Sequence, residues 1–241
     1  MRLIHLQACL NGNRRRGEHA AVPLSRDEIV LDAARAMKNG AMSLHIHPRG
    51  ADGAETLAPE ACDAVVRGVR VACPDLPIGL STGMWIERDE KRRLELIAAW
   101  TAPPDFVSVN LSEPGVPELC GLLMRRGIGI EAGVWAVADV KTLVDLGIAG
   151  RCVRVLVETQ PTDAVAAVAD ADAIDEALDA AGFAGPRLHH GEGIATWHVL
   201  ARAVARGHDI RIGLEDTLEL PNGRRARDNA ELVERASALL R

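Results

Sequence analysis

The sequence predicts an α/β protein, a (β/α)8 TIM barrel, on three observations. Strand-like and helical patterns alternate from one end of the chain to the other, eight of each. Dividing the 241 residues among eight strand–helix units gives about 30 residues each, which is the length of a strand, a helix and two short loops. No G-x-G-x-x-G follows the first strand, which argues against an open nucleotide-binding sheet. We therefore expect residues 1–241 to form a single barrel domain.

The expected strands are short segments that are apolar or alternate in polarity. In chain order they are Leu3–Leu10, Met42–His47, Ile78–Ser81, Phe106–Asn110, Ile128–Glu131, Cys152–Glu158, Arg187–His190 and Ile210–Glu215. The first expected helix begins at Ser25, which forms a capping box with Glu28, and ends at Asn39-Gly40. The later helices are expected at Pro59–Ala72, Asp89–Trp100, Pro117–Arg126, Ala138–Gly147, Thr162–Ala181, Thr196–Arg206 and Arg227–Leu240.

Most of these strands alternate apolar and polar residues, which buried parallel strands seldom do. Leu44 and Ile46, for example, alternate with His45 and His47. In a barrel the apolar face packs on the helices and the polar face lines the lumen. The polar residues concentrate at the C-terminal strand ends, where barrel enzymes carry their active sites. The alternative is an antiparallel sheet with its polar face in water, which the intervening helices disfavour.

Composition and charge exclude several classes of protein. Lys and Arg number 28 against 34 Asp and Glu, and only 2% of residues are aromatic, so a nucleic-acid partner is not expected. The five cysteines follow no regular spacing, which suits reduced thiols better than a disulfide framework. No apolar run approaches the ~20 residues that a membrane span needs. We expect a cytoplasmic protein without a membrane partner.

His45-Ile46-His47 is the strongest local motif. Alternate residues of a strand project to the same side, so the two imidazoles can converge on one metal ion. Two neutral histidines need at least one carboxylate to hold Zn²⁺ with an open coordination position. Glu215 is the candidate on the last strand, with Glu131 behind it. The alternative is a pair of packed or hydrogen-bonded histidines.

The segment Arg211–Asp216, with the sequence R-I-G-L-E-D, is the second concentration of polar groups. Its alternation places Arg211 and Glu215 on the lumen side of the last strand, with Asp216 just beyond the strand end. A carboxylate beside a metal ion and an arginine is equipped as a general base. The alternative is an Arg–Asp pair that only ties the strand to the next loop.

Short hydrogen-bonding side chains end two further strands. Ser81 and Thr82 close the third strand, and Ser108 and Asn110 close the fourth. These groups suit the anchoring of a substrate carboxylate or ketone oxygen, and they equally suit the capping of the helices that follow.

Two loops at the expected rim of the barrel carry ionisable residues. The segment 189–193, with the sequence H-H-G-E-G, is a candidate substrate wall or alternative set of metal ligands. The run Arg14-Arg15-Arg16 after the first strand is expected to be a solvated loop.

Taken together, these motifs resemble the β-keto acid cleavage enzymes. The residues that carry the resemblance are, in chain order, Ala8-Cys9-Leu10-Asn11-Gly12, His45 with His47, Ser81-Thr82-Gly83, Ser108 with Asn110, Glu131, Arg211–Asp216 and Asn229-Ala230-Glu231-Leu232-Val233. The resemblance implies a (β/α)8 barrel that binds Zn²⁺ through His45, His47 and Glu215. It implies proton transfer by Asp216 with Arg211 and Ser81. Substrate contacts are expected from Thr82, Ser108, Asn110 and Glu131.

The implied reaction exchanges acyl groups between a β-keto acid and acetyl-CoA, giving acetoacetate and a new acyl-CoA through a retro-Claisen step. A Lewis acid on a ketone beside a carboxylate base is what carbanion formation requires. Arg14, where family members often carry an acidic group, would favour an acidic substrate tail.

Two alternatives stay open. One is a metal-dependent C–C lyase or hydrolase that acts on a small keto or carboxylate substrate without coenzyme A. The other is a metal-bearing barrel that binds a small carboxylate without turning it over. In each case the expected partners are a small molecule and further copies of the same chain.

Overall fold

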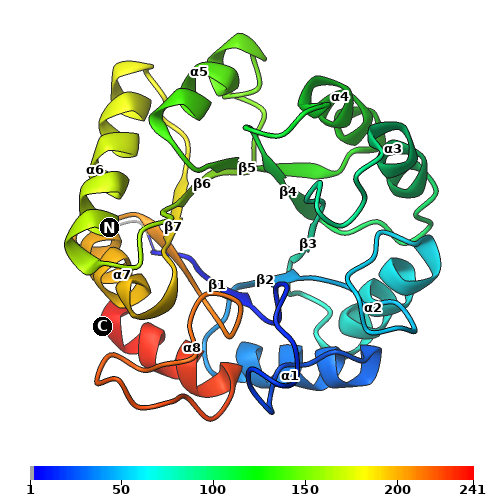
Figure 1. Ribbon diagram of the computed structural model, residues 1–241, viewed down its shortest axis with the longest axis horizontal. Coiled ribbons are helices and arrows are strands. Elements are labelled where there is room, and N and C mark those ends of the chain that lie inside the picture. The colour runs from blue at the N-terminus through cyan, green and yellow to red at the C-terminus, as the bar shows by residue number, and fades with distance from the viewer. Residues whose placement is uncertain (1–2) are drawn as a thin grey trace.

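A computed structural model describes residues 3–241 of the protein as a closed barrel of eight parallel strands in the order β1 to β8, ringed by helices (Figure 1). The predicted (β/α)8 barrel is therefore confirmed. The strands are β1 (Leu6–Cys9), β2 (Ser43–Ile46), β3 (Ile78–Ser81), β4 (Phe106–Asn110), β5 (Gly129–Val134), β6 (Arg154–Glu158), β7 (Arg187–His190) and β8 (Asp209–Ile212). Each strand pairs with the next, and β8 pairs with β1 to close the barrel.

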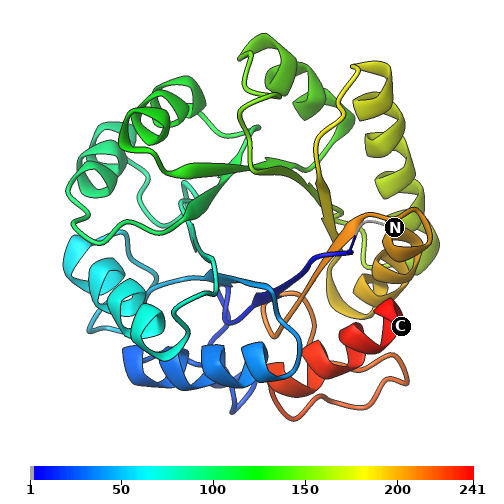
Figure 2. The ribbon, with the colours of Figure 1, turned by 180° about the vertical axis from the view of Figure 1, so that it is seen from behind.

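Eight α-helices surround the strands, as the view from behind also shows (Figure 2). They are α1 (Arg26–Lys38), α2 (Pro59–Ala72), α3 (Glu90–Ala98), α4 (Val116–Arg126), α5 (Val137–Asp145), α6 (Ala164–Ala180), α7 (Thr196–Ala205) and α8 (Asn229–Ser237). The capping box of Ser25 and Glu28 is present at the start of α1, as predicted. Within residues 3–241 no helix is long and apolar enough to cross a membrane, and the cysteines are free thiols.

The alternating strand pattern divides the apolar face from the lumen in most strands. Leu44 and Ile46 of β2 belong to the apolar core, which also contains residues of the surrounding helices. The prediction is wrong for β7, in which Arg187 faces outward and His190 faces the cavity at the barrel mouth. The cause lies in α6, where buried Asp175 offers its carboxylate to Arg187 at 2.9 Å.

Polar side chains fill the lumen toward the N-terminal ends of the strands. Gln7 of β1 donates a hydrogen bond of 3.0 Å to Glu131 of β5, on the opposite side of the barrel. Arg154 of β6 donates to the same carboxylate at 2.6 Å and lies over the Phe106 ring, 4.9 Å from its centroid. Gly79 leaves room for that ring, because a Cβ there would lie 2.2 Å from it. We call Gln7, Phe106, Glu131 and Arg154 the floor of the barrel.

Candidate active site

Three side chains converge at the C-terminal ends of β2 and β8. The Nε2 atoms of His45 and His47 lie 2.9 Å apart. Glu215 Oε1 lies 3.7 Å from the first and 3.4 Å from the second. Both histidine side chains are buried, and the Glu215 side chain is mostly buried. The structure therefore brings together the three residues predicted to hold a metal ion.

The position of Glu215 depends on a turn rather than on a strand. β8 ends at Ile212, and the N–H groups of Asp216 and Thr217 both donate to the Gly213 carbonyl. The prediction that strand alternation aims Glu215 into the lumen is therefore wrong, although the side chain arrives there. Gly213 permits the approach of the turn to β1, because a Cβ at this residue would lie 1.7 Å from the Cys9 carbonyl oxygen.

A second glycine makes room for the Glu215 side chain. Gly12 has a φ of +49°, in the left-handed region that favours glycine, and a Cβ there would lie 2.4 Å from Glu215 Cγ. Its carbonyl oxygen accepts a hydrogen bond from Arg49. The glycines of the A-C-L-N-G and R-x-G-x-E-D motifs thus shape the same three-ligand cluster.

The donor set fits a zinc ion. Four-coordinate Zn²⁺, bound by nitrogen and oxygen at about 2.0–2.2 Å, separates its ligand atoms by about 3.3–3.6 Å. The three distances between the His45, His47 and Glu215 ligand atoms span 2.9 to 3.7 Å. Glu215 Oε2 is buried without a hydrogen-bond partner among the described residues. Three protein ligands would leave a fourth position for substrate.

Glu55 and Trp85 support the cluster from outside. Glu55 Oε1 lies 2.5 Å from His47 Nδ1, the ring nitrogen turned away from the convergence point. Trp85 Nε1 donates to both Glu55 oxygens at 3.2 Å, and its ring stacks on His47 with centroids 6.4 Å apart. A carboxylate on the far nitrogen of a histidine fixes its tautomer and orientation for metal binding. Sequence analysis missed both residues, since neither belongs to a regular spacing.

Arg211 joins the metal-ligand cluster to Asp216. Its guanidinium donates to Glu215 and, at 2.9 Å, to Asp216 Oδ1. Burial opposes ionisation of Glu215, but Arg211 and then His47 hold its pKa well below the usual value. Burial lowers the pKa of His45 to about 4, so this ring is neutral. For His47 burial acts in the same direction, but Glu215 and Glu55 raise its pKa to about 9.

Asp216 is enclosed by donors. Cys9 Sγ donates to its Oδ2 at 2.7 Å, and burial, together with this carboxylate, raises the pKa of the thiol well above its usual value. On the other side His190 Nδ1 lies 3.2 Å from Asp216 Oδ1. Burial would raise the pKa of Asp216, but Arg211 and His190 hold it below the usual value. The ionised carboxylate therefore sits beside the three-ligand cluster.

Residues 4–241 match the family model described as beta-keto acid cleavage enzyme. The chain belongs to the beta-keto acid cleavage enzyme family. Members of this family are enzymes that cleave a C–C bond.

Two curated relatives extend along nearly the whole chain. The 3-keto-5-aminohexanoate cleavage enzyme of Fusobacterium nucleatum is 26% identical over 261 aligned positions, covering 99% of this chain and 92% of the relative. That of Acetoanaerobium sticklandii is 23% identical, covering 90% of this chain and 84% of the relative.

Among solved structures, a ternary complex of ObcA with a C4-CoA adduct and oxalate has the same fold, with a TM-score of 0.76 at 17% identity. The alignment covers 91% of this chain and 64% of the ObcA chain, so the chain spans less than two thirds of that protein.

In this member of the family, the polar residues of β3 and β4 make contacts of their own at the strand ends. Ser81 and Ser108 are paired across the two strands. The Thr82 hydroxyl donates to the Ser108 carbonyl at 2.6 Å, and the Asn110 amide donates to Glu113 at 2.8 Å. Thr82 and Asn110 thus stabilise the strand ends in this structure, and their contact with substrate stays a prediction.

Glu131, expected near the metal ligands, belongs to the floor of the barrel. Its pKa is lowered against the effect of burial, chiefly by Arg154. Its Oε1 atom is buried and has no hydrogen-bond partner within residues 3–241. The carboxylate therefore has one oxygen free to accept a hydrogen bond, and substrate binding by Glu131 stays a prediction.

A cavity of about 580 Å³ opens over the site. The residues that line it are Asn13, Arg14, Arg15, Glu18, His47, Trp85, Trp135, Glu158, Thr159, Gln160, His190, Gly191, Glu192, Arg211, Glu215 and Asp216. Arg14 donates to the Leu214 carbonyl and pairs with Glu18, so it is anchored over the end of β8. The expectation of a solvated loop holds for Arg15 and Arg16, which are exposed, whereas Arg14 is half-buried. Arg14 and Arg15 also line the cavity.

Proposed function

We propose that the protein is a Zn²⁺-dependent beta-keto acid cleavage enzyme that transfers an acyl group from a β-keto acid to coenzyme A. The observation that carries the proposal is the convergence of His45, His47 and Glu215 next to the Arg211–Asp216 pair. A metal centre adjacent to an ionised carboxylate is the combination that carbanion chemistry beside a ketone requires.

In this proposal His45, His47 and Glu215 hold the metal ion. When bound, Zn²⁺ supplies a Lewis acid for the ketone and carboxylate oxygens of the substrate. Asp216 accepts a proton from the carbon between those two groups. Arg211 holds Asp216 in place and keeps it ionised while it is buried.

Residues of β3 to β5 complete the proposed substrate site. Ser81 assists the proton transfer that Asp216 and Arg211 carry out, and Ser108 presents its hydroxyl to the substrate. Thr82, Asn110 and Glu131 shape the wall and floor beneath it. All these residues are buried at the lumen or at its rim, so their polar groups would meet a substrate away from bulk water.

The overall exchange balances without a further reactant. The acyl group of the keto acid leaves its C2 carbon for the CoA sulfur, and the acetyl group of acetyl-CoA moves to that carbon. The products are acetoacetate and a new acyl-CoA. The enzymes of Fusobacterium nucleatum and Acetoanaerobium sticklandii, named for 3-keto-5-aminohexanoate cleavage, support a β-keto acid substrate. The ObcA complex with a C4-CoA adduct supports a thioester partner.

Elemental analysis combined with a substrate screen tests the proposal. The purified protein should contain one zinc per chain and convert a β-keto acid only when acetyl-CoA is present, with acetoacetate as a product. Turnover of a keto acid alone would favour the CoA-independent lyase or hydrolase. A zinc-loaded protein that converts no member of a broad β-keto acid panel would refute the proposal.

A further inference from the structure

Three consecutive strands place a row of ionisable groups along one wall of the cavity. Glu158 ends β6, His190 ends β7, and Asp216 follows β8. His190 Nε2 lies 3.1 Å from Glu158 Oε2, and His190 Nδ1 lies 3.2 Å from Asp216 Oδ1. Neither contact has the alignment of an ideal hydrogen bond. Such departures are common at catalytic residues before substrate binds.

The end of β7 and the loop after it hold Asp216 at two points. His190, the last residue of the strand, contacts the side chain, and the Gly193 N–H in the loop donates to the Asp216 carbonyl oxygen at 2.8 Å. The loop is close-packed, because a Cβ at Gly191 would lie 3.1 Å from the Thr159 hydroxyl and 3.3 Å from Thr196 Cα. The carboxylate of Asp216 therefore depends on the end of β7, and its backbone depends on the loop.

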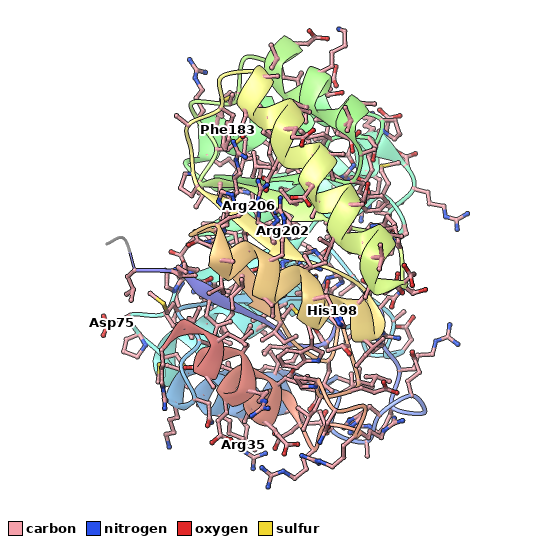
Figure 3. The ribbon with its side chains drawn as sticks, turned by 90° about the vertical axis from the view of Figure 1, so that its left-hand side faces the viewer. Arg35, Asp75, Phe183, His198, Arg202 and Arg206 are labelled. Atoms are coloured by element: carbon pink, nitrogen blue, oxygen red, sulfur yellow. The ribbon has the colours of Figure 1, made fainter. Side chains whose placement is uncertain are left out.

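The neighbouring histidine shows that the position of His190 is specific. His189 points to the opposite face of β7, where its ring stacks on His208 with centroids 4.9 Å apart and approaches Asp175 of α6 at 3.6 Å. That side is a buried ion-pair layer beneath α6 and α7, and Arg202 of this layer is visible between the two helices (Figure 3). One histidine thus belongs to the scaffold and the other to the cavity.

Charge balance gives His190 a second role at the cavity wall. The carboxylates of Glu158, Glu215 and Asp216 share this wall with the Arg211 guanidinium. Burial and Arg211 lower the pKa of His190, but Asp216 and Glu158 outweigh them and raise it to about 9. The charged ring therefore lies between the carboxylates of Glu158 and Asp216 and offsets their repulsion.

We propose that His190 is a positioning residue for Asp216, oriented in turn by Glu158. This inference rests on the function proposed above, in which Asp216 removes the substrate proton. Arg211 contacts both oxygens of the Asp216 carboxylate, Cys9 contacts Oδ2, and His190 contacts Oδ1, so the orientation of this carboxylate depends in part on His190. Glu158 fixes the His190 ring from the opposite side, as the third member of a catalytic triad fixes its histidine.

The first test is a set of substitutions in the zinc-loaded enzyme. In His190→Phe the ring remains but both nitrogens are lost, and kcat should fall about 10²-fold, because a displacement of about 1 Å at a catalytic group has that effect. KM and zinc content should stay within about threefold of the wild type, because His190 contacts no proposed metal ligand. His190→Gln, whose amide can still donate to Asp216, should recover about tenfold of the lost kcat, and Glu158→Gln should lose about tenfold.

His189→Leu is the matched control, since it alters the adjacent residue on the opposite face. It should lower the melting temperature and leave kcat unchanged. A kcat within threefold of wild type in both His190 variants would overturn the inference, as would a loss that falls on KM or on zinc content.

A crystal structure of His190→Phe separates this inference from the proposed function. The Asp216 carboxylate should rotate away from its two contacts with Arg211, and an unmoved carboxylate would overturn the positioning role. If the wild-type enzyme converts no β-keto acid, the proposed function fails, and the orientation of Asp216 still decides whether His190 positions it.

Discussion

Replacing Glu55 with glutamine tests whether the outer carboxylate strengthens metal binding. Glu55 contacts His47 Nδ1 at 2.5 Å, which places the ring proton there and leaves Nε2 free for an ion. Glu55→Gln keeps a hydrogen-bond acceptor and removes the charge, whereas Glu55→Leu removes both. Loss of such a partner costs about 10- to 100-fold in metal affinity, or about 1.4–2.7 kcal/mol. We expect the loss of zinc affinity to be about 10-fold in Glu55→Gln and about 100-fold in Glu55→Leu.

Competition with a chromophoric zinc chelator measures the dissociation constant of each variant, and circular dichroism checks the fold. Trp85→Phe is the matched control, because it removes the indole donor to Glu55 and leaves the contact of Glu55 with His47 in place. It should change zinc affinity by less than about threefold. Folded Glu55→Leu protein with wild-type zinc affinity would refute the reasoning, and so would equal losses in Trp85→Phe and Glu55→Leu.

The remaining predictions concern other groups of the site and one of the scaffold. His45→Ala should lose zinc and keep a folded barrel, so full zinc occupancy would remove His45 as a ligand. Asp216→Asn should keep zinc and lose at least about 10²-fold in kcat, and an unchanged rate would exclude Asp216 as the base. Gly12→Ala should weaken zinc binding, because a Cβ there meets Glu215, and should lower the unfolding free energy by about 1–2 kcal/mol, because the left-handed backbone is strained for alanine. Unaltered zinc titration and melting curves would contradict this prediction. Burial raises the pKa of Asp32 to about 7, so the contribution of this group to stability should be largest below about pH 4 and should fall by up to about 4 kcal/mol between pH 4 and 7. Asp32→Asn should not show this pH-dependent loss. If the unfolding free energies of the two proteins change in parallel from pH 4 to 8, the prediction is wrong.

The barrel and the convergence of the proposed metal ligands were predictable because their signals are local. α2 runs from Pro59 to Ala72 as its apolar spacing predicts, and β3, β4 and β7 have their predicted bounds. The His45–His47 spacing directs two side chains to one side of a strand whatever surrounds it. The place of Glu215 on the last expected strand indicated it as the carboxylate ligand, and resemblance to the β-keto acid cleavage enzymes gave the same residue. The family match confirms that resemblance, and the structure brings the three side chains together.

Residues whose role depends on tertiary contacts were harder to predict. Glu55 lies eight positions after His47 in the chain, and the residues around it form no motif that indicates a role. Glu158 was expected only as the end of a strand, since its partner His190 lies on the next one. At β8 the alternation of Ile210, Ile212 and Leu214 continues past the true strand end, and only the close approach of Gly213 to β1 reveals the turn.

The floor of the barrel closes the lumen beneath the cavity. Because Gln7 and Glu131 are hydrogen-bonded across the lumen, a small molecule that reaches the buried site must leave through the mouth by which it came. In the proposed two-substrate reaction both reactants would share this mouth. A keto acid bound at the three-ligand cluster would then have to enter before the thioester, so the order of binding proposed for that reaction follows from the shape of the barrel.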